Sequence, residues 1–326
     1  MFPVTTSSFK RRRVLRAGLL AAGALSAAGV SSRPAWAASK TVHIGTQKGV
    51  TLFLLSQKGA LVKALAPFGY GVDYTEFPGG PQLLEALNVG AIDFGAVGET
   101  PPIFAQAAGA PLVYVGHEPA APKGEAIIVP QNSAIQTVAQ LKGKTVALNK
   151  GSNVHYLLIR ALEKAGLQYS DIQPSYLAPA DARAAFEQGS VDAWVIWDPY
   201  LAAAEAETNA RVLADGTGLV ANRQFVLATR NFTDSAPQVV STILRELDKV
   251  DRWAQANRSA AAAALAPGLG LPVSIVEVFL SRAGFGVYPM TPDVVAYQQQ
   301  VADTFSQLQL IPRKVDISSA VWTAPA

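Results

Sequence analysis

Short β-rich runs alternate with helical stretches in the first part of this 326-residue chain, and this alternation constrains the fold more than any other feature. Proline pairs or glycine–proline steps open two of the intervening helices, because proline is well placed in a first helical turn. A β-α-β-α-β-α-β order implies a mostly parallel sheet with helices on both faces. We expect strands at 41–45, 71–77, 92–97 and 112–116, with a first helix at 52–65.

A second unit of the same kind begins near Glu125. The run 225–229 leads back to the first unit, and the chain from there to about residue 310 has a helical pattern. We expect strands of the second unit at 126–129, 145–148, 191–196 and 211–214, and helices at about 151–164 and 179–188. We therefore predict an α/β chain of two lobes with a cleft between them: residues 38–124 with about 225–326, and residues 125–224.

The N-terminus has the three parts of an export signal. Lys10 to Arg16 is basic, residues 17–30 are uncharged and rich in alanine, leucine and glycine, and Ala35-Trp36-Ala37 offers small residues for cleavage. The order of two arginines, another residue, two apolar residues and a basic one in Arg11–Arg16 also resembles the twin-arginine pattern. We predict that residues 1–37 direct export to the periplasm and that the mature chain starts at Ala38.

Charge and cysteine content exclude several classes once the signal is set aside. The chain has no cysteine, which excludes disulfides, thiolate nucleophiles and the cysteine anchor of a lipoprotein. The signal carries six basic residues and no acidic ones, so 21 basic and 24 acidic residues remain, a net charge of −3. The predicted pI near 9.0 therefore belongs to the precursor and does not indicate nucleic-acid binding. The uncharged run 259–276 contains prolines and glycines and predicts two helices joined by a turn.

The carboxyl ends of the predicted strands are where a ligand is expected, because open α/β sheets bind ligands in the crevice beyond those ends. Five loops leave strands in this way, and most of them lead directly into predicted helix starts. These loops are 46–51, 78–82, 98–102, 150–154 and 197–200.

The same loops carry motifs that resemble the aliphatic sulfonate-binding proteins of ABC transporters, within the group that includes taurine- and nitrate-binding proteins. The resemblance covers nearly all of residues 41–322. The similar stretches include Gln47-Lys48-Gly49, Phe77-Pro78 with Gly80-Pro81-Gln82, Leu84 to Gly90, Pro101 to Ala110, Lys150-Gly151-Ser152, Pro179-Ala180-Asp181-Ala182-Arg183-Ala184-Ala185-Phe186 and Ile196-Trp197-Asp198-Pro199-Tyr200. The resemblance implies a type II-like periplasmic binding fold that closes about a hinge, a sulfonate ligand and delivery to a permease in the inner membrane. It also implies a periplasmic location. We further expect a monomer without a cofactor.

A sulfonate head has three equivalent acceptor oxygens and one negative charge, so it needs several directed donors. Helix N-termini offer free backbone N–H groups and partial positive charge. Such residues can equally serve only as N-caps or turn formers. The candidate donors are Gln47, Lys48, Gly79, Gly80, Thr100, Ser152 and Asn153, and the resemblance adds weight to Gln47, Gly80 and Ser152.

The remaining candidates concern the alkyl tail and the charge of the cleft. Trp197 follows a strand and could form an apolar wall, and Phe225 could do the same or belong to the core. Asp198 could cap the next helix or bind an amine. Glu99 would repel an anion unless a base such as Lys48 or Lys123 paired with it; it could instead bind an amine or exclude a dianion.

Signals for an enzyme are weak in this chain. The three histidines have no metal-ligand spacing, and the sequence contains no Gly-x-Ser-x-Gly elbow. We therefore predict a binding protein rather than an enzyme, with no metal and no nucleic-acid partner. The open alternatives are a taurine, nitrate or other oxyanion ligand, a protein of the thiamine-precursor group that binds or turns over its ligand, and a sensory binding protein.

Overall fold

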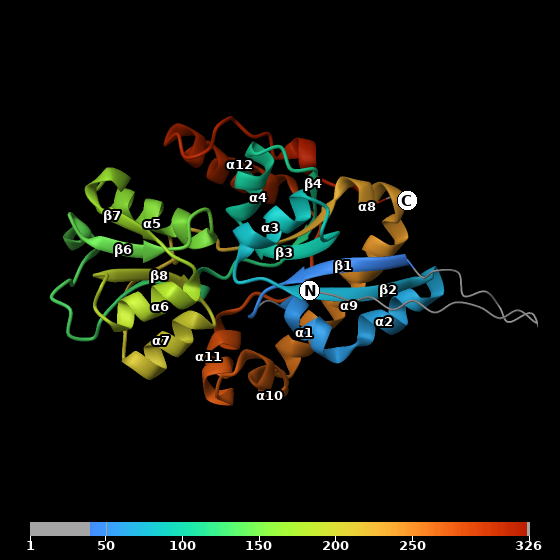
Figure 1. The fold of residues 1–326 in the computed structure, drawn as a ribbon, viewed down its shortest axis with the longest axis horizontal. Coiled ribbons are helices and arrows are strands. Elements are labelled where there is room, and N and C mark those ends of the chain that lie inside the picture. Colours follow the sequence, from blue (N-terminus) through green and yellow to red (C-terminus); the bar gives the residue numbers. More distant parts are fainter. Residues whose placement is uncertain (1–39, 50, 325–326) are drawn as a thin grey trace, which may run out of the picture. The chain divides into compact units, whose positions relative to one another are not determined.

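A computed structural model describes residues 40–49 and 51–324 of the chain (Figure 1). The predicted export signal and its cleavage site lie outside these residues. The described residues form two five-stranded sheets, each flanked by helices, as the alternation of β and helical runs predicts.

The first sheet has the strand order β2-β1-β3-β10-β4. The strands β1, β2, β3 and β4 run in one direction, while β10 is inserted between β3 and β4 antiparallel to both. The bounds are β1 Lys40–Thr46, β2 Tyr70–Glu76, β3 Phe94–Gly98, β4 Leu112–His117 and β10 Gln224–Thr229. The run 225–229 thus returns to the first sheet as expected.

The second sheet repeats this plan with the order β7-β6-β8-β5-β9. Here β5 is the inserted strand, antiparallel to β8 and β9, while β6 is parallel to β7 and β8. The bounds are β5 Glu125–Val129, β6 Thr145–Leu148, β7 Gln173–Tyr176, β8 Ala193–Trp197 and β9 Arg211–Asp215. One antiparallel strand per sheet is compatible with the predicted mostly parallel arrangement, although its position in each sheet was not predicted.

The helices cover both faces of each sheet (Figure 1). Alternate residues of β10 face opposite cores: Phe225 and Leu227 pack with α3, α4 and α12, whereas Val226 and Ala228 pack with α1, α2 and α9 to α11. In the second sheet, α5 covers one face and α6 and α7 the other. The helices are α1 Thr51–Lys58, α2 Ala60–Leu65, α3 Gly80–Asn88, α4 Pro101–Ala107, α5 Asn153–Lys164, α6 Pro179–Glu187, α7 Tyr200–Thr208, α8 Arg230–Ser235, α9 Pro237–Ala256, α10 Arg258–Leu269, α11 Val273–Arg282 and α12 Pro292–Gln307.

Two details differ from or extend the expectations. The helix predicted at 52–65 is divided at Gly59, whose φ of 60° is left-handed and ends α1 before α2 begins. The run 259–276 forms α10 and α11, two helices joined by a turn, as predicted. Within the described chain, no single helix is long and apolar enough to cross a membrane; α10 and α11 reach that length only as a pair bent by 116°.

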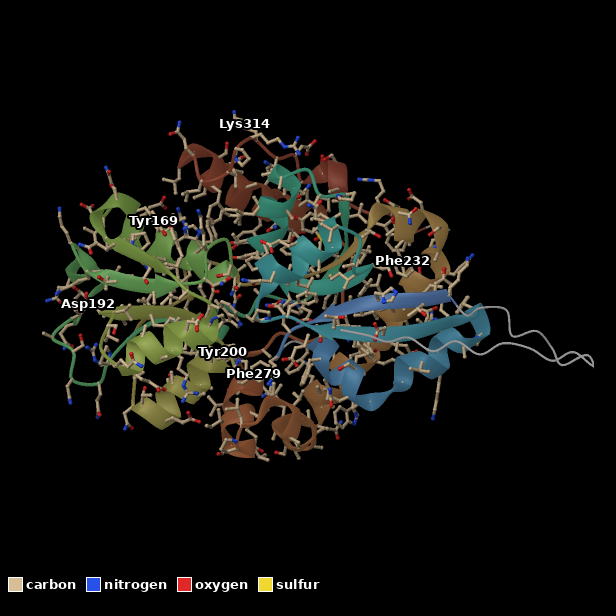
Figure 2. All side chains as sticks on the ribbon, in the orientation of Figure 1. Tyr169, Asp192, Tyr200, Phe232, Phe279 and Lys314 are labelled. Carbon is tan, nitrogen blue, oxygen red and sulfur yellow. The ribbon has the colours of Figure 1, made fainter. Side chains whose placement is uncertain are left out.

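C-terminal helices join the two lobes on opposite sides. On one side, Phe305 of α12 packs against Phe104 of α4 and Tyr156 of α5, with ring centroids 5.1 and 6.1 Å away. On the other side, α11 packs on α7; Figure 2 labels Phe279 of α11 and Tyr200 of α7 in this region. The division of the chain at residues 125 and 225 remains a prediction about which segments move together.

Candidate ligand-binding cleft

A cavity lies where the carboxyl ends of the strands from both sheets meet. All five loops expected at this edge contribute residues to its wall. Its volume is about 70 Å³, and an outer hollow of about 240 Å³ adjoins it at Gln47, Lys48 and Trp197. The loop residues in the wall are Gln47, Lys48, Gly49, Thr51, Gly80, Gly98, Pro101, Asn153, Trp197 and Asp198.

Helices from both lobes begin at this cavity, and α3 and α5 are one such helix from each lobe. Gly80 is the first residue of α3, and Asn153 is the first residue of α5. Neither helix has a side-chain cap that accepts a hydrogen bond from its first backbone N–H groups. Both helices therefore direct N-terminal partial positive charge toward the cavity, which suits an anionic group.

The polar side chains on the first-lobe wall already make some contacts within the protein. Gln47 is buried and donates from Nε2 to the carbonyl oxygen of Ala96 at 2.9 Å, which leaves its second amide hydrogen for a ligand. Lys48 is half-exposed, and its Nζ lies 3.9 Å from Oε1 of Glu76. Lys48 is therefore the cation closest to the outer hollow, with a weak partner that an anion could replace.

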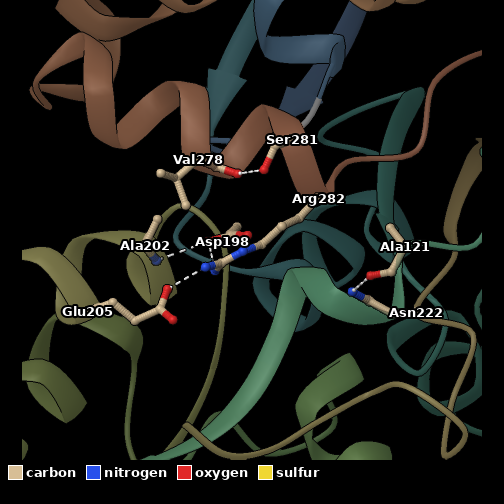
Figure 3. Close-up of polar contacts among 8 residues, drawn as sticks. All are labelled: Ala121, Asp198, Ala202, Glu205, Asn222, Val278, Ser281 and Arg282. Carbon is tan, nitrogen blue, oxygen red and sulfur yellow. Dashed lines mark hydrogen bonds and ion pairs between the residues drawn. The ribbon is translucent and has the colours of Figure 1, made fainter. Parts of the chain in front are cut away.

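A hydrogen-bond network at the lobe junction holds Asn153 in place. Its Nδ2 donates to Oε2 of Glu125 and to Oδ1 of Asn222, the latter at 3.1 Å. Asn222 in turn donates to the carbonyl oxygen of Ala121 at 2.9 Å, in the other segment that connects the lobes (Figure 3). The N–H groups of the Asn153 side-chain amide thus donate to other residues of the protein. The backbone N–H of Asn153 remains for a ligand.

Asp198 and Arg282 form the most buried ion pair of the cavity wall. Arg282 Nη1 lies 3.5 Å from Oδ1 of Asp198, and Nη2 lies 2.6 Å from Oε2 of Glu205 (Figure 3). Asp198 also caps α7 by accepting from the backbone N–H of Ala202 at 3.0 Å. Burial raises the pKa of Asp198 to about 7, although Arg282 opposes this shift. The peptide bond between Asp198 and Pro199 is cis.

The two lobes touch across the cleft at glycines. A Cβ added to Gly98 would lie 2.9 Å from the Cβ of Asn153, and one added to Gly79 would lie 3.5 Å from Oδ1 of Asn149. At Gly49 the φ of 94° is left-handed, and a Cβ would meet the ring of Pro199. The lobes can approach each other closely because these glycines have no side chain. The structure describes the cleft in a closed arrangement.

Comparisons with known proteins agree with this architecture. A family model described as NMT1/THI5 like matches residues 69–261. An aliphatic sulfonate-binding protein of Escherichia coli K12 is 47% identical over 94% of both chains. The chain belongs to the aliphatic sulfonate-binding protein family. The resemblance found in the sequence is thereby confirmed.

Solved structures of the aliphatic sulfonate-binding family share the fold. The alkanesulfonate-binding protein SsuA from Xanthomonas axonopodis pv. citri, solved bound to MOPS, has a TM-score of 0.83 at 44% identity, covering 86% of this chain and 98% of that one. The periplasmic aliphatic sulfonate-binding protein SsuA from E. coli has a TM-score of 0.80 at 47% identity, covering 88% and 93%. The predicted two-lobed fold is thus confirmed.

Five of the residues expected to touch a ligand do not line the cavity of this family member. Ser152 is buried and donates to the carbonyl oxygen of Asn149 at 2.7 Å, and Gly79 precedes α3 beside the second lobe. Thr100 is fully buried, with a hydroxyl that has no hydrogen-bond partner among the described residues. Phe225 is core: its ring packs at 5.2 Å on Tyr114. The fifth residue is Glu99.

Glu99 faces away from the cleft, toward α12. Its Oε1 accepts from the Tyr297 hydroxyl at 3.1 Å, and its Oε2 accepts from the backbone N–H of Arg223 at 3.2 Å. Within residues 40–49 and 51–324, no ion pair joins it to Lys48 or Lys123, the two bases considered from the sequence. Complete burial raises the pKa of Glu99 to about 7, so its proton occupancy changes near neutrality.

Several cavity residues of this sulfonate-binding family member were not expected from the sequence. In the sequence, Arg282 has the pattern of an ordinary cation in the last turn of a helix. Glu118 follows a strand and belongs to no recognisable motif. Most of the apolar residues lie on α9, α10 and α11, far from the five loops in sequence, where their spacing is that of any buried helix face. The unexpected wall residues include Leu54, Glu118, Ala254, Leu265, Phe279, Leu280, Arg282 and Phe285.

Proposed function

We propose that this protein is the substrate-binding component of an ABC importer and captures aliphatic sulfonates between its lobes. The observation that carries the proposal is the cavity, where the N-termini of α3 and α5 converge beside an apolar interior. This pairing suits a ligand with an anionic head and a carbon tail. The family relatives described as alkanesulfonate-binding proteins give independent support.

The head would be held mainly by directed hydrogen-bond donors, with Lys48 as the cation beside it. Backbone N–H groups at the two helix starts, the free amide hydrogen of Gln47 and the ammonium of Lys48 supply donors for three sulfonate oxygens. Sulfate, with a second negative charge and no tail, would forgo the apolar contacts and meet the carboxylates of the wall. Selectivity for sulfonates over sulfate follows from this combination.

Capture would proceed by closure of the lobes about the two connecting segments. Ligand would bind to one lobe in the open form, and the other lobe would add its donors on closing, as in other hinge-closing proteins. Gly98 of one lobe and Asn153 of the other must then come into contact on closing. The closed protein would deliver its ligand to a permease, without chemical change of the ligand.

The protein would do this in the periplasm as a monomer. The predicted signal in residues 1–37 would be removed near Ala37 and Ala38, and the absence of cysteine leaves no lipid anchor. The relative from E. coli described as periplasmic supports this location. Mass spectrometry of the exported protein tests the mature start at Ala38.

Calorimetric titration of residues 38–326 tests the ligand. Sulfonates of two to eight carbons, taurine, nitrate and sulfate are compared in one buffer. We expect an affinity that depends on tail length and no detectable binding of sulfate. No detectable binding of any sulfonate would overturn the proposed ligand.

A glycine variant tests closure. Gly98→Ala is expected to reduce sulfonate affinity by about tenfold or more, because its methyl group keeps the lobes apart at Asn153. Gly71→Ala is the matched control, since a Cβ there has no neighbour closer than 3.8 Å. Unchanged affinity in Gly98→Ala, or scattering profiles that show no compaction with ligand, would contradict closure.

A further inference from the structure

The cavity continues from the cleft into the helical layer of the first lobe. There it is enclosed by α1, α9, α10, α11 and the segment after α11, and we call this part the inner chamber. Its apolar side chains are almost completely buried. They are Leu54, Ala254, Leu265, Phe279, Leu280 and Phe285. A chamber of this kind suits the tail of a ligand whose head lies at the helix N-termini.

One carboxyl group of a buried pair interrupts the apolar wall. Glu118 lines the cavity and is 4% exposed. Asp251 of α9 lies behind this wall with no exposed surface, near enough for its charge to raise the pKa of Glu118. The hydroxyl of Thr51, which also lines the cavity, opposes the rise in the pKa of both carboxyl groups. One hydroxyl can donate to only one carboxyl group at a time, so this buried acid pair is short of donors.

The oxygens of the pair show the same shortage. Asp251 Oδ2 accepts from the backbone N–H of Gly286 at 2.9 Å. In the described part of the chain, Oε1 of Glu118 and Oδ1 of Asp251 are buried without any hydrogen-bond partner. A buried acceptor without a donor is unfavourable, so a donor that entered the chamber would be stabilised there.

The cations near the chamber are already paired. Arg282 of α11 is held by Asp198 and Glu205, and Arg252 of α9 by Asp248 at 2.8 Å. Burial, the mutual repulsion of the pair and, for Asp251, nearby Asp248 raise the pKa of both carboxyl groups. Among the described residues, Arg252 is the cation that acts on Asp251, and it is shared with Asp248.

We propose that the inner chamber binds the tail of a sulfonate that carries an ammonium group, with Glu118 and Asp251 as its counter-ions. This inference rests on the proposed function, which supplies the anionic end of the ligand. An ammonium has three N–H donors and one positive charge, and it would complete both the hydrogen bonding and the charge of the pair. On binding, the ammonium enters charged and the proton held by the pair leaves to the buffer.

Two ligands of equal length separate this proposal from simple tail burial. In 3-aminopropane-1-sulfonate an ammonium occupies the place of the terminal methyl of butane-1-sulfonate. Wild-type protein is expected to bind the amine at least about tenfold more tightly near pH 8, and this preference should shrink toward pH 6 as the pair retains its proton. Calorimetry in buffers of different ionisation enthalpy should detect proton release with the amine alone.

The Glu118→Gln and Asp251→Asn variants identify the acids responsible. Each is expected to bring the ratio of the two affinities to within about threefold of one, whereas Glu277→Gln, an exposed acid on α11, keeps the wild-type ratio. Equal affinities in wild type would overturn the proposal and leave sulfonate capture standing; this comparison needs no variant. Binding of neither ligand would overturn both.

Discussion

The protein buries two pairs of carboxyl groups, and they differ in what surrounds them. Glu99 and Glu125 lie at the junction of the lobes, outside the cavity wall, and receive donors from Tyr297, the Arg223 backbone and Asn153. Oε1 of Glu125 has no donor among the described residues. In the chamber pair, Asp251 Oδ2 accepts from the Gly286 backbone N–H, while Oε1 of Glu118 and Oδ1 of Asp251 have no donor in the described part of the chain. Both pairs pay the desolvation of buried acids, so the difference lies in how fully the protein satisfies them.

The difference indicates that the two carboxyl pairs have different roles. The donors of the junction pair come from α5 in one lobe, α12 and a connecting segment, so the pair ties these elements together. The chamber pair ties little together, and its Glu118 faces the space where a ligand tail would lie. A buried network with donors on most of its oxygens is typical of structure, and a pair with few donors beside a cavity is typical of a binding site.

The largest effect is expected from Asn153→Asp at the junction. The substitution keeps the shape of the side chain, removes both donated hydrogen bonds and adds a third carboxyl group beside Glu125 and Glu99. We expect a loss of about 4 kcal/mol in the free energy of unfolding at pH 8 and a smaller loss at pH 5, where the acids hold protons. Urea unfolding measures both values.

Asn209→Asp is the control for this change. Asn209 is exposed and has a left-handed φ of 51°, a conformation that aspartate also tolerates. A loss below about 1 kcal/mol in Asn153→Asp at pH 8 would mean that the junction network contributes little, and the contrast between the two pairs would disappear.

The next effect concerns the pH dependence of stability through Glu99. Its pKa is raised from 4.5 to about 7 in the folded protein, so its contribution is fully present below pH 4.5 and is lost as pH rises to about 7. This group alone accounts for about 3 kcal/mol at most. In Glu99→Gln the decline in stability between pH 5 and pH 8 should become shallower, with a residual slope from Asp198 and Asp251. A slope equal to that of wild type would contradict the assignment.

A smaller effect is expected from Tyr297→Phe. The hydroxyl donates to Glu99 and accepts from the backbone N–H of Ala221 at 2.8 Å, so its removal leaves two buried groups without partners. We expect a loss of about 2 kcal/mol and a further rise in the pKa of Glu99. Thermal unfolding of this variant beside Tyr288→Phe, which alters an exposed ring, gives the comparison. An equal effect in both variants would argue against a special role for the junction.

The sequence predicts the strands well because their pattern is local. Runs such as 41–45 and 112–116 carry the residues and length of strands, and the helix starts at Pro81 and Pro101 follow from proline geometry. The antiparallel insertion of β5 and β10 could not be predicted, because strand pairing depends on contacts between distant residues.

Two of the predicted site residues lie one position away from residues that line the cavity. Gly98 lines the cavity and Glu99 does not, and Gln224 lines it where Phe225 packs in the core. Successive side chains of extended backbone point to opposite sides, so an error of one position exchanges cleft for core. The chamber escaped prediction because α9, α10 and α11 reach it through the tertiary fold alone.

The smallest change in stability is expected from Glu118→Gln. The sign of this change distinguishes the chamber pair from the junction pair. The amide removes one of two buried like charges and can donate to Asp251 while accepting from Thr51. Stability at pH 8 should therefore stay within about 0.5 kcal/mol of wild type or rise by about 1 kcal/mol, because groups placed for binding are often costly to the fold. Urea unfolding beside Glu277→Gln measures this change. A loss as large as that of Asn153→Asp would make Glu118 a structural residue like Glu125, whereas a gain combined with the lost preference for an amine would mean that the acid is retained for its ligand.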